Sequence, residues 1–310
     1  MKIAMVGCGG IGGYYGGLLA RAGHDVVFIA RGVHLDALRQ KGLTVYSVHG
    51  DFSVAPVLAT DNPAEAGVAE LAVVCVKTPA TEEAARAMQP MIGPETAVMS
   101  LQNGVDAAAR LGAVVGMEHV IGGATYISAA LEAPGVIRQV SQFRRIVLGE
   151  MDGLVTPRIR RITEALQRMG IAVETTDNIR KVLWTKFVFI AGFSGVGTLT
   201  RMELGDFRAV PGTRALLVSL MQEVSALAQA SGVELEPDVI AQTLELMDGA
   251  ASAMKPSMQR DVEAGRPSEL ESMIGLITRQ GRECRVPTPV ADLVYAALLP
   301  AELKARRPAA

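Results

Sequence analysis

The sequence predicts an α/β protein in which a doubly wound, mostly parallel sheet is followed by an all-helical region. Two observations lead to this prediction. In the first half of the 310 residues, short apolar runs alternate with helical stretches, which is typical of strands buried on both faces of a parallel sheet. From about Asp177 onward, helical stretches follow one another without the alternation that marks a strand. We therefore expect two domains, residues 1–176 and residues 177–310.

The first expected strand leads directly into a glycine-rich turn. The apolar run Ile3–Val6 is followed by Gly7-Cys8-Gly9-Gly10-Ile11-Gly12 and then by a helical stretch. In a G-x-G-x-x-G turn the first glycine permits a sharp bend, the second lets the backbone approach a pyrophosphate, and the third lets the helix pack against the strand. The N-terminus of that helix faces the phosphate charge. The first domain is therefore interpreted as a Rossmann-type dinucleotide-binding domain.

The second apolar run, Val26–Ile29, ends at Ala30-Arg31. A free ribose 2′-hydroxyl is usually held by an Asp or Glu about 20 residues after the glycine turn. No acidic residue occurs between Val26 and Leu35, and Arg31 stands where the acid would be. Because a guanidinium group suits a 2′-phosphate, the sequence favours NADP(H) over NAD(H).

The remaining elements follow from apolar runs, helical periodicity and turn residues. In the first half we expect strands at Leu71–Val76, Ala97–Leu101 and His119–Ala124, a hairpin in Leu43–Leu58, antiparallel strands in Ser128–Gly149, an edge strand at Ala172–Thr175, and helices at Tyr14–Ala22, Thr81–Met91 and Arg158–Met169. In the second half we expect helices at residues 178–193, 207–231, 236–254, 269–284 and 288–299. The tail Arg306–Ala310 is expected to be disordered.

From composition we expect a soluble cytoplasmic protein. The net charge of −2 gives no indication of a nucleic-acid or anionic-membrane partner. The three cysteines and four histidines lack metal-ligand spacing, so no metal is expected. No signal peptide is evident, and Val182–Thr200, although near membrane length, contains Lys186 and three glycines that indicate a buried helix and loop. A methionine-rich helical half could supply a homodimer face or simply fill the core.

Four polar side chains are candidates for chemistry, Lys186, Lys77, Asn103 and Glu269. Lys186 is the only formal charge between Val182 and Thr200, and burial would lower its pKa toward the range of a general acid. The alternative is a surface lysine whose stem covers apolar neighbours. Lys77 and Asn103 follow two neighbouring expected strands, at the edge where doubly wound sheets bind ligands, although Asn103 before Gly104 also suits a plain turn. Ser268 and Glu271 have the spacing of a helix capping box, whereas Glu269 has no such structural explanation.

Taken in order, these motifs resemble those of the ketopantoate reductases (2-dehydropantoate 2-reductases). The resemblance rests on the glycine turn, Arg31, Val76-Lys77, Gln102-Asn103-Gly104, Trp184-x-Lys186, Ser257-Met258-x-x-Asp261 and Glu269, and it covers nearly the whole chain. It implies a Rossmann domain followed by a helical domain, and an NADPH-dependent reduction of a 2-oxo acid, foremost 2-dehydropantoate to pantoate in pantothenate biosynthesis.

The resemblance also implies roles for individual residues. Lys186 would protonate or polarise the carbonyl oxygen, and Glu269 would hold the substrate hydroxyl and the lysine network. Ser257 would contact the substrate carboxylate, and Asn103 and Lys77 would line the junction of substrate and nicotinamide ribose. The cofactor set would comprise Gly7, Cys8, Gly9, Gly10, Ile11, Gly12, Arg31, Lys77 and Asn103.

One departure from the family pattern concerns the substrate. Pantoate-forming members carry asparagines four and eight residues after the catalytic lysine, and these positions are Ile190 and Ser194 here. Loss of an amide that hydrogen-bonds a substrate hydroxyl removes a strong source of discrimination. The substrate-binding set is thus Asn103, Ile190, Ser194 and Ser257, and the alternatives to ketopantoate reduction are a reductase for another, more apolar 2-oxo acid or a non-catalytic NADPH-binding protein. A 3-hydroxy acid or glycerol-phosphate dehydrogenase is disfavoured by the Trp184-x-Lys186 and Glu269 pattern.

Overall fold

The computed structural model describes residues 1–307 and divides into two compact units. The first comprises Met1–Gln102 and Asp106–Ile179, and the second comprises Asn103–Val105 and the chain from Arg180 onward. The tail expected to be disordered lies outside the described residues from Pro308. Arg306 is held, because its Nε donates a 2.7 Å hydrogen bond to Glu302.

An eight-stranded sheet forms the first unit, in the order β12-β11-β8-β7-β6-β1-β2-β5. β11 runs antiparallel to β8 and β12 runs parallel to β11, while the other pairs in the sheet are parallel. The strands are β1 (Lys2–Val6), β2 (Asp25–Ile29), β5 (Leu58–Thr60), β6 (Leu71–Val74), β7 (Ala97–Ser100), β8 (Val120–Tyr126), β11 (Arg145–Glu150) and β12 (Ala172–Thr175). The predicted α/β class, the parallel strands and the edge strand are confirmed.

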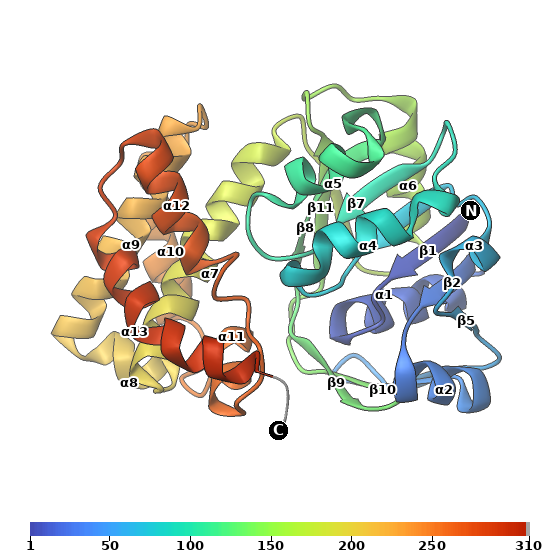
Figure 1. Cartoon of the computed structure of the whole chain (residues 1–310), viewed down its shortest axis with the longest axis horizontal. Helices are drawn as coiled ribbons and strands as arrows, with labels where there is room; N and C mark the ends of the chain where they lie inside the picture. Colours follow the sequence, from blue (N-terminus) through green and yellow to red (C-terminus); the bar gives the residue numbers. More distant parts are fainter. Residues whose placement is uncertain (308–310) are drawn as a thin grey trace. The chain divides into compact units, whose positions relative to one another are not determined.

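Alternate residues of each strand enter two separate cores, as period-two geometry requires. Ile3 and Met5 of β1 pack in the core that contains the apolar faces of α1 (Gly10–Arg21) and α6 (Pro157–Gln167). Ala4 and Val6 pack in the opposite core, with α3 (Pro63–Ala66), α4 (Thr81–Ala87) and α5 (Ala107–Val115). Figure 1 shows α4 and α5 side by side on this second face. Burial on both faces explains the nearly continuous apolar runs of the strands.

A second, four-stranded sheet, ordered β4-β3-β10-β9, packs against α1. The expected hairpin is present as β3 (Leu43–Ser47) and β4 (Phe52–Val54), and the expected strands after Ser128 include β9 (Ala129–Ala133) and β10 (Val136–Gln139). The prediction that the hairpin extends to Leu58 is wrong, because Leu58–Thr60 pairs with β2 in the main sheet. β10 pairs in parallel with β3, which follows α2 (Gly32–Lys41), although several strands of the main sheet lie between β3 and β10 in the sequence.

The described part of the second unit contains helices and no strand, which confirms the all-helical prediction. The helices are α7 (Ile179–Thr200), α8 (Leu204–Ala209), α9 (Pro211–Ala230), α10 (Val239–Asp248), α11 (Ser257–Glu263), α12 (Ile274–Cys284) and α13 (Pro289–Ala305). The single helix expected over 207–231 is divided at Val210, where Pro211 begins a new helix. α13 continues through Pro300, beyond its expected end at residue 299.

The expectation that the chain leaves the helix at the glycines after residue 193 is wrong, because α7 runs unbroken to Thr200. A Cβ on Gly195 would lie 2.6 Å from Leu220 Cδ2 and 3.1 Å from the Ile274 side chain, and one on Gly192 would lie 3.0 Å from Leu217. The glycines therefore let α9 and α12 pack closely against α7. By length and composition α7 could span a membrane, but 61% of its most apolar window is buried inside the protein, as in a core helix.

Candidate active site

The glycine-rich turn has the geometry that a dinucleotide requires. Gly7 adopts φ +96°, a conformation that favours glycine, and its N–H donates to Ile29 O across 3.1 Å. A Cβ on Gly12 would lie 2.0 Å from Gly7 O, so only glycine lets α1 approach the turn so closely. Gly9 has open space where a side chain would stand. No side chain caps the N-terminus of α1, so its first N–H groups suit an anion.

The other members of the turn are held by packing. A Cβ on Gly10 would lie 2.2 Å from Ala129 O, so Gly10 lets α1 approach β9 closely. Ile11 packs against the core between the main sheet and α1. Cys8 is buried, and its Sγ donates weakly to Ile29 O at 3.5 Å. Burial raises the pKa of the Cys8 thiol, and it raises that of Cys75 to about 12, so both remain protonated thiols.

A hollow of about 230 Å³ lies beside this turn. It is bounded by the turn and by the ends of β2 and β6, together with α4. Of the predicted cofactor residues, Gly7, Cys8, Gly9 and Arg31 line it. Gly10, Ile11, Gly12, Lys77 and Asn103 do not. The shape and the open N-terminus of α1 fit a nucleotide with phosphate groups.

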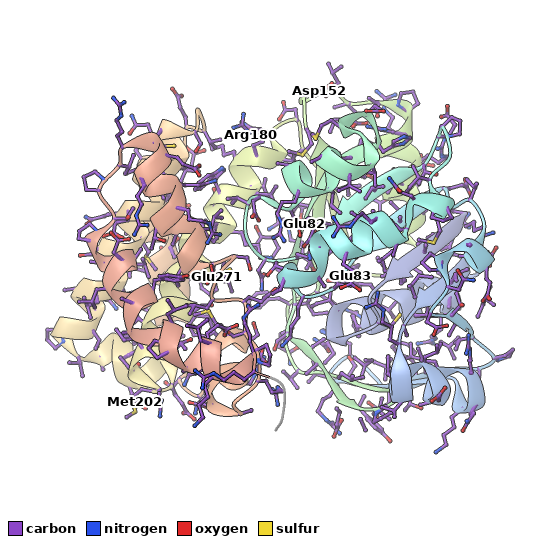
Figure 2. The ribbon with its side chains drawn as sticks, viewed as in Figure 1. Glu82, Glu83, Asp152, Arg180, Met202 and Glu271 are labelled. Carbon is purple, nitrogen blue, oxygen red and sulfur yellow. The ribbon has the colours of Figure 1, made fainter. Side chains whose placement is uncertain are left out.

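Arg31 lies at the start of α2 and forms an ion pair with Glu83 of α4, with 2.6 Å between Nη1 and Oε1. Both side chains are well exposed, and both residues line the hollow (Figure 2 labels Glu83). Asp61 lines it as well. The Asp61 and Glu83 carboxylates could not be predicted from the sequence, because each lies far from Arg31 along the chain.

His34 ties the turn to the second sheet, and its contacts determine its tautomer. Gly135 N–H donates to Nδ1 at 3.0 Å, so the ring proton is on Nε2, which donates to Cys8 O at 2.8 Å. Burial lowers the pKa of His34, which favours this neutral form. The link between His34 and the glycine-rich turn was not predicted from the sequence.

The ends of β6 and β7 are joined by a buried side chain. Gln102 Nε2 donates to Val76 O at 2.8 Å and to Thr81 Oγ1 at 2.9 Å, while its Oε1 accepts from Ser100. These bonds hold the segment that carries Lys77, whose side chain is exposed. Lys77 thus lies at the predicted edge of the sheet, outside the lining of the hollow.

In the second unit, Lys186 meets two of the other predicted residues. Lys186 is half-buried on α7, and its Nζ donates to Asn103 Oδ1 at 3.1 Å. Asn103 reaches it from the short segment 103–105, which belongs by its contacts to this unit. Burial lowers the pKa of Lys186 to about 8, and the charge of Glu269 opposes that fall. The structure therefore brings Lys186, Asn103 and Glu269 into one electrostatic group.

The predicted substrate residues occupy different surroundings. Ile190 and Ser194 follow Lys186 at helical spacing on α7, with Ile190 half-buried and Ser194 2% exposed. Ser257 is exposed at the first position of α11. Asp261 lies on the same helix and pairs with Arg266, with 3.1 Å between the charged groups.

The expectation of a capping box between Ser268 and Glu271 is wrong. α12 begins only at Ile274, and Ser268 instead contacts Glu302 of α13, which accepts from its N–H and Oγ. Glu271 (labelled in Figure 2) accepts a 2.6 Å hydrogen bond from Tyr295 Oη. Glu302 was missed in the sequence because it is separated from Ser268 by 34 positions, and in the structure it is 1% exposed.

Comparison with known proteins identifies the family. The model of the family described as "Ketopantoate reductase PanE/ApbA" matches residues 3–153, and its C-terminal companion matches residues 178–302. The chain belongs to the ketopantoate reductase family. It is accordingly an oxidoreductase that acts on a CH–OH group, and its Rossmann-type and helical regions are those of ketopantoate reductases.

Relatives are similar over almost their whole length. A 2-dehydropantoate 2-reductase from Mesorhizobium japonicum is 32% identical over 96% of this chain and 96% of its own. The crystal structure of a PanE/ApbA family ketopantoate reductase from Ralstonia eutropha superposes with a TM-score of 0.91 at 31% identity, covering 99% of this chain and 100% of that one. D-mandelate dehydrogenase, solved with NADH and anilino(oxo)acetate, has the same fold at 22% identity, with a TM-score of 0.91 and coverage of 99% and 100%.

Among the described residues, no three His, Cys, Asp or Glu side chains gather where they could hold a metal ion.

Proposed function

We propose that this ketopantoate reductase family member reduces a 2-oxo acid to the 2-hydroxy acid with NADPH, and that 2-dehydropantoate is its first candidate substrate. Residues 1–176 would bind the cofactor and residues 177–310 would bind substrate and supply a dimer face. The observation that carries the proposal is Lys186, an amine with a pKa of about 8 beside Asn103 and Glu269. We also propose a cytoplasmic location.

The proton transfer follows from the state of Lys186. Below about pH 8 the amine is protonated, so it can donate a hydrogen bond to the C2 carbonyl oxygen and then a proton to the developing alkoxide. Bound NADPH would supply the hydride that C2 receives. A positive charge placed where negative charge develops stabilises the transition state more than the ground state. Asn103 fixes the direction of the amine, Glu269 supports its charge, Ser257 would contact the substrate carboxylate, and the amine regains its proton from solvent.

The preference for NADPH rests on Arg31 and the glycine-rich turn. Gly7, Gly9 and Gly12 shape the turn, and Cys8, Gly10 and Ile11 complete it, so that the pyrophosphate would meet the N-terminus of α1. The Arg31 guanidinium beside the hollow would bind the 2′-phosphate. Lys77 and Asn103 would contact the nicotinamide ribose.

A second candidate function is the reduction of a more apolar 2-oxo acid. It is favoured by Ile190, an alkyl side chain one turn after Lys186 where pantoate-forming relatives have an amide. A substrate hydroxyl would find no partner in the Ile190 side chain, while an apolar substrate would lose nothing there.

The test is oxidation of NADPH, followed by its absorbance, with 2-dehydropantoate and with a panel of aliphatic and aromatic 2-oxo acids. NADH is run in parallel, and Ile190→Asn is compared with the natural protein. We expect 2-dehydropantoate to be reduced with NADPH, and Ile190→Asn to improve its kcat/KM by about tenfold, the effect of about 1.4 kcal/mol from one hydrogen bond. Reduction only of another 2-oxo acid would establish the second candidate, and no turnover with retained NADPH binding would establish a non-catalytic protein.

A further inference from the structure

Glu302 is a buried carboxylate whose negative charge is not stabilised by its own helix. It lies in the last turn of α13 and is 1% exposed. A negative charge near the C-terminus of a helix is disfavoured by the helix dipole, and burial of the charge adds a desolvation cost. The side chain must therefore be stabilised by contacts outside the regular helix.

Those contacts hold the segment before α12. The two carboxylate oxygens of Glu302 accept from Ser268 N–H at 3.2 and 3.0 Å, and Oε2 accepts from Ser268 Oγ at 2.5 Å. Arg306 Nε donates to Oε1 at 2.7 Å and balances the charge. Ser268 Oγ in turn accepts from Leu270 N–H at 3.2 Å, so the backbone on both sides of Glu269 is fixed.

Glu269 is the neighbour whose charge acts on Lys186. Its backbone carbonyl also accepts hydrogen bonds from Ser272 and Met273 as the chain turns toward α12. A rigid backbone on either side restricts where the Glu269 carboxylate can lie. Because the strength of a charge–charge interaction depends on distance, a change in this backbone alters the field at the amine.

We propose that Glu302 is a positioning residue, which clamps Ser268 so that the Glu269 carboxylate stays directed at Lys186. The inference rests on the proposed role of Lys186 as proton donor. Asn103 Oδ1 and the Glu269 carboxylate act on Lys186, and Ser268 and Arg306 face Glu302. The path by which Glu302 would act on the amine runs through Ser268 and the backbone of Glu269.

A matched control lies at the N-terminus of α13, where a buried carboxylate from another helix accepts backbone hydrogen bonds. Glu223 of α9 is also buried, at 8% exposed, and accepts from Val290 N–H at 2.7 Å and Ala291 N–H at 2.9 Å. There the negative charge meets the N-terminus of α13, which the helix dipole favours. Glu223 therefore has a purely structural explanation and no path to Glu269 through Ser268.

The experiment compares Glu302→Gln, Glu302→Ala and Ser268→Ala with Glu223→Gln in the full-length protein. The pKa of Lys186 is measured by competitive labelling with acetic anhydride across pH, with the modified lysine identified by mass spectrometry. This readout needs no substrate. We expect the pKa to be lower by about 0.5 or more in the three clamp variants, because a displaced carboxylate no longer supports the ammonium. Glu223→Gln should lower stability to urea and leave the pKa unchanged.

The kinetic readout should follow the same pattern. The fall of kcat at high pH should begin at lower pH in the clamp variants, and Glu302→Asp should restore part of the natural profile. If the clamp variants fold, bind NADPH and keep the natural pKa of Lys186, the proposed role of Glu302 is wrong. If the pKa moves as expected while no 2-oxo acid is reduced by the natural protein, the positioning role stands and the proposed function fails. Should Glu302→Ala fail to fold, Glu302→Gln and Ser268→Ala decide the matter.

Discussion

At the scale of single residues, the molecule places a cation where water is scarce. Burial removes water from the Lys186 amine, which donates to the neutral amide of Asn103 and is supported by the charge of Glu269. The sequence predicted this group because an isolated lysine in an apolar helix is conspicuous. It could not predict Glu302, Glu83 or the contacts of His34, because these depend on the approach of residues that lie far apart in the chain.

Replacing Lys186 with Met should remove the proton donor and keep most of the apolar stem. We expect kcat to fall by about 10²-fold or more, the usual contribution of a positioned acid, with NADPH affinity retained. In the natural protein kcat should fall as pH rises through about 8, since the amine loses its proton there. Steady-state kinetics over pH check both expectations, and an unchanged kcat in Lys186→Met would exclude the catalytic role.

The same lysine should leave a signature in stability. Its folded pKa of about 8 lies below the unfolded value of about 10.4, so between these values the unfolded chain binds more protons. The free energy of unfolding should therefore rise with pH across this window, relative to Lys186→Met, by at most about 3 kcal/mol. Urea unfolding at pH 7.5 and at pH 10 measures the difference, and parallel pH dependence in the two proteins would contradict it.

Glu83 should compete with NADPH for Arg31. The Glu83 carboxylate already occupies Nη1 of the guanidinium, and its negative charge repels a 2′-phosphate that approaches the same group. We expect Glu83→Gln to lower KM for NADPH about two- to fivefold, the scale of an exposed ion pair, and to leave KM for NADH unchanged. The control is Glu132→Gln, which breaks the exposed pair with Arg138 in the small sheet. An unchanged or higher KM for NADPH in Glu83→Gln would show that Glu83 does not compete with the 2′-phosphate for Arg31.

At the scale of elements, the strands of the main sheet were predicted well because burial on both faces leaves a continuous apolar run. The errors came where tertiary packing overrides local preference. The glycines of α7 suggested a loop, yet they stay helical because α9 and α12 occupy the space of the missing side chains. Leu58 was assigned to the hairpin, because the three residues Leu58–Thr60 carry too little pattern to reveal that they pair with β2.

The packing of α7 can be tested at Gly195. Gly195→Val places methyl groups against Leu220 and Ile274, so we expect a loss of about 1–3 kcal/mol in unfolding free energy. Gly212→Ala is the control, since nothing lies within 4 Å of its added Cβ and alanine favours the helix by about 0.5–1 kcal/mol. Urea unfolding of the two variants should give opposite signs. Equal stability of Gly195→Val and the natural protein would show that α7 can move away from its neighbours.

At the scale of the whole molecule, the order of elements was enough to predict a sheet-containing first half and a helical second half. The pairing of β10 with β3 could not be predicted from the sequence, because each strand is short and β5, β6, β7 and β8 of the main sheet lie between them in the chain. The extent of the hollow beside the glycine-rich turn could not be predicted from the sequence either, since residues from four separate segments line it.

Cofactor binding should stabilise the whole protein by mass action. At a free NADPH concentration of 100 times Kd, we expect the free energy of unfolding to rise by about 2.7 kcal/mol, if the ligand does not bind the unfolded chain. NADH at the same concentration should raise it less, and Lys186→Met should respond to NADPH as the natural protein does. Thermal unfolding with each nucleotide measures this, and equal effects of NADPH and NADH would remove the case for 2′-phosphate recognition.

Residues 103–105 belong to the helical unit, although the chain before and after them belongs to the first unit. No single cut of the gene therefore separates the two units. A fragment that starts at Arg180 would have the lysine but would lack Asn103, the side chain that accepts its hydrogen bond. Mixing separately expressed halves could return that partner only if the halves reassociate. A truncated fragment would show the properties of Lys186 without its hydrogen bond to Asn103, not those of an intact domain. Full-length variants are therefore the sound way to study this lysine.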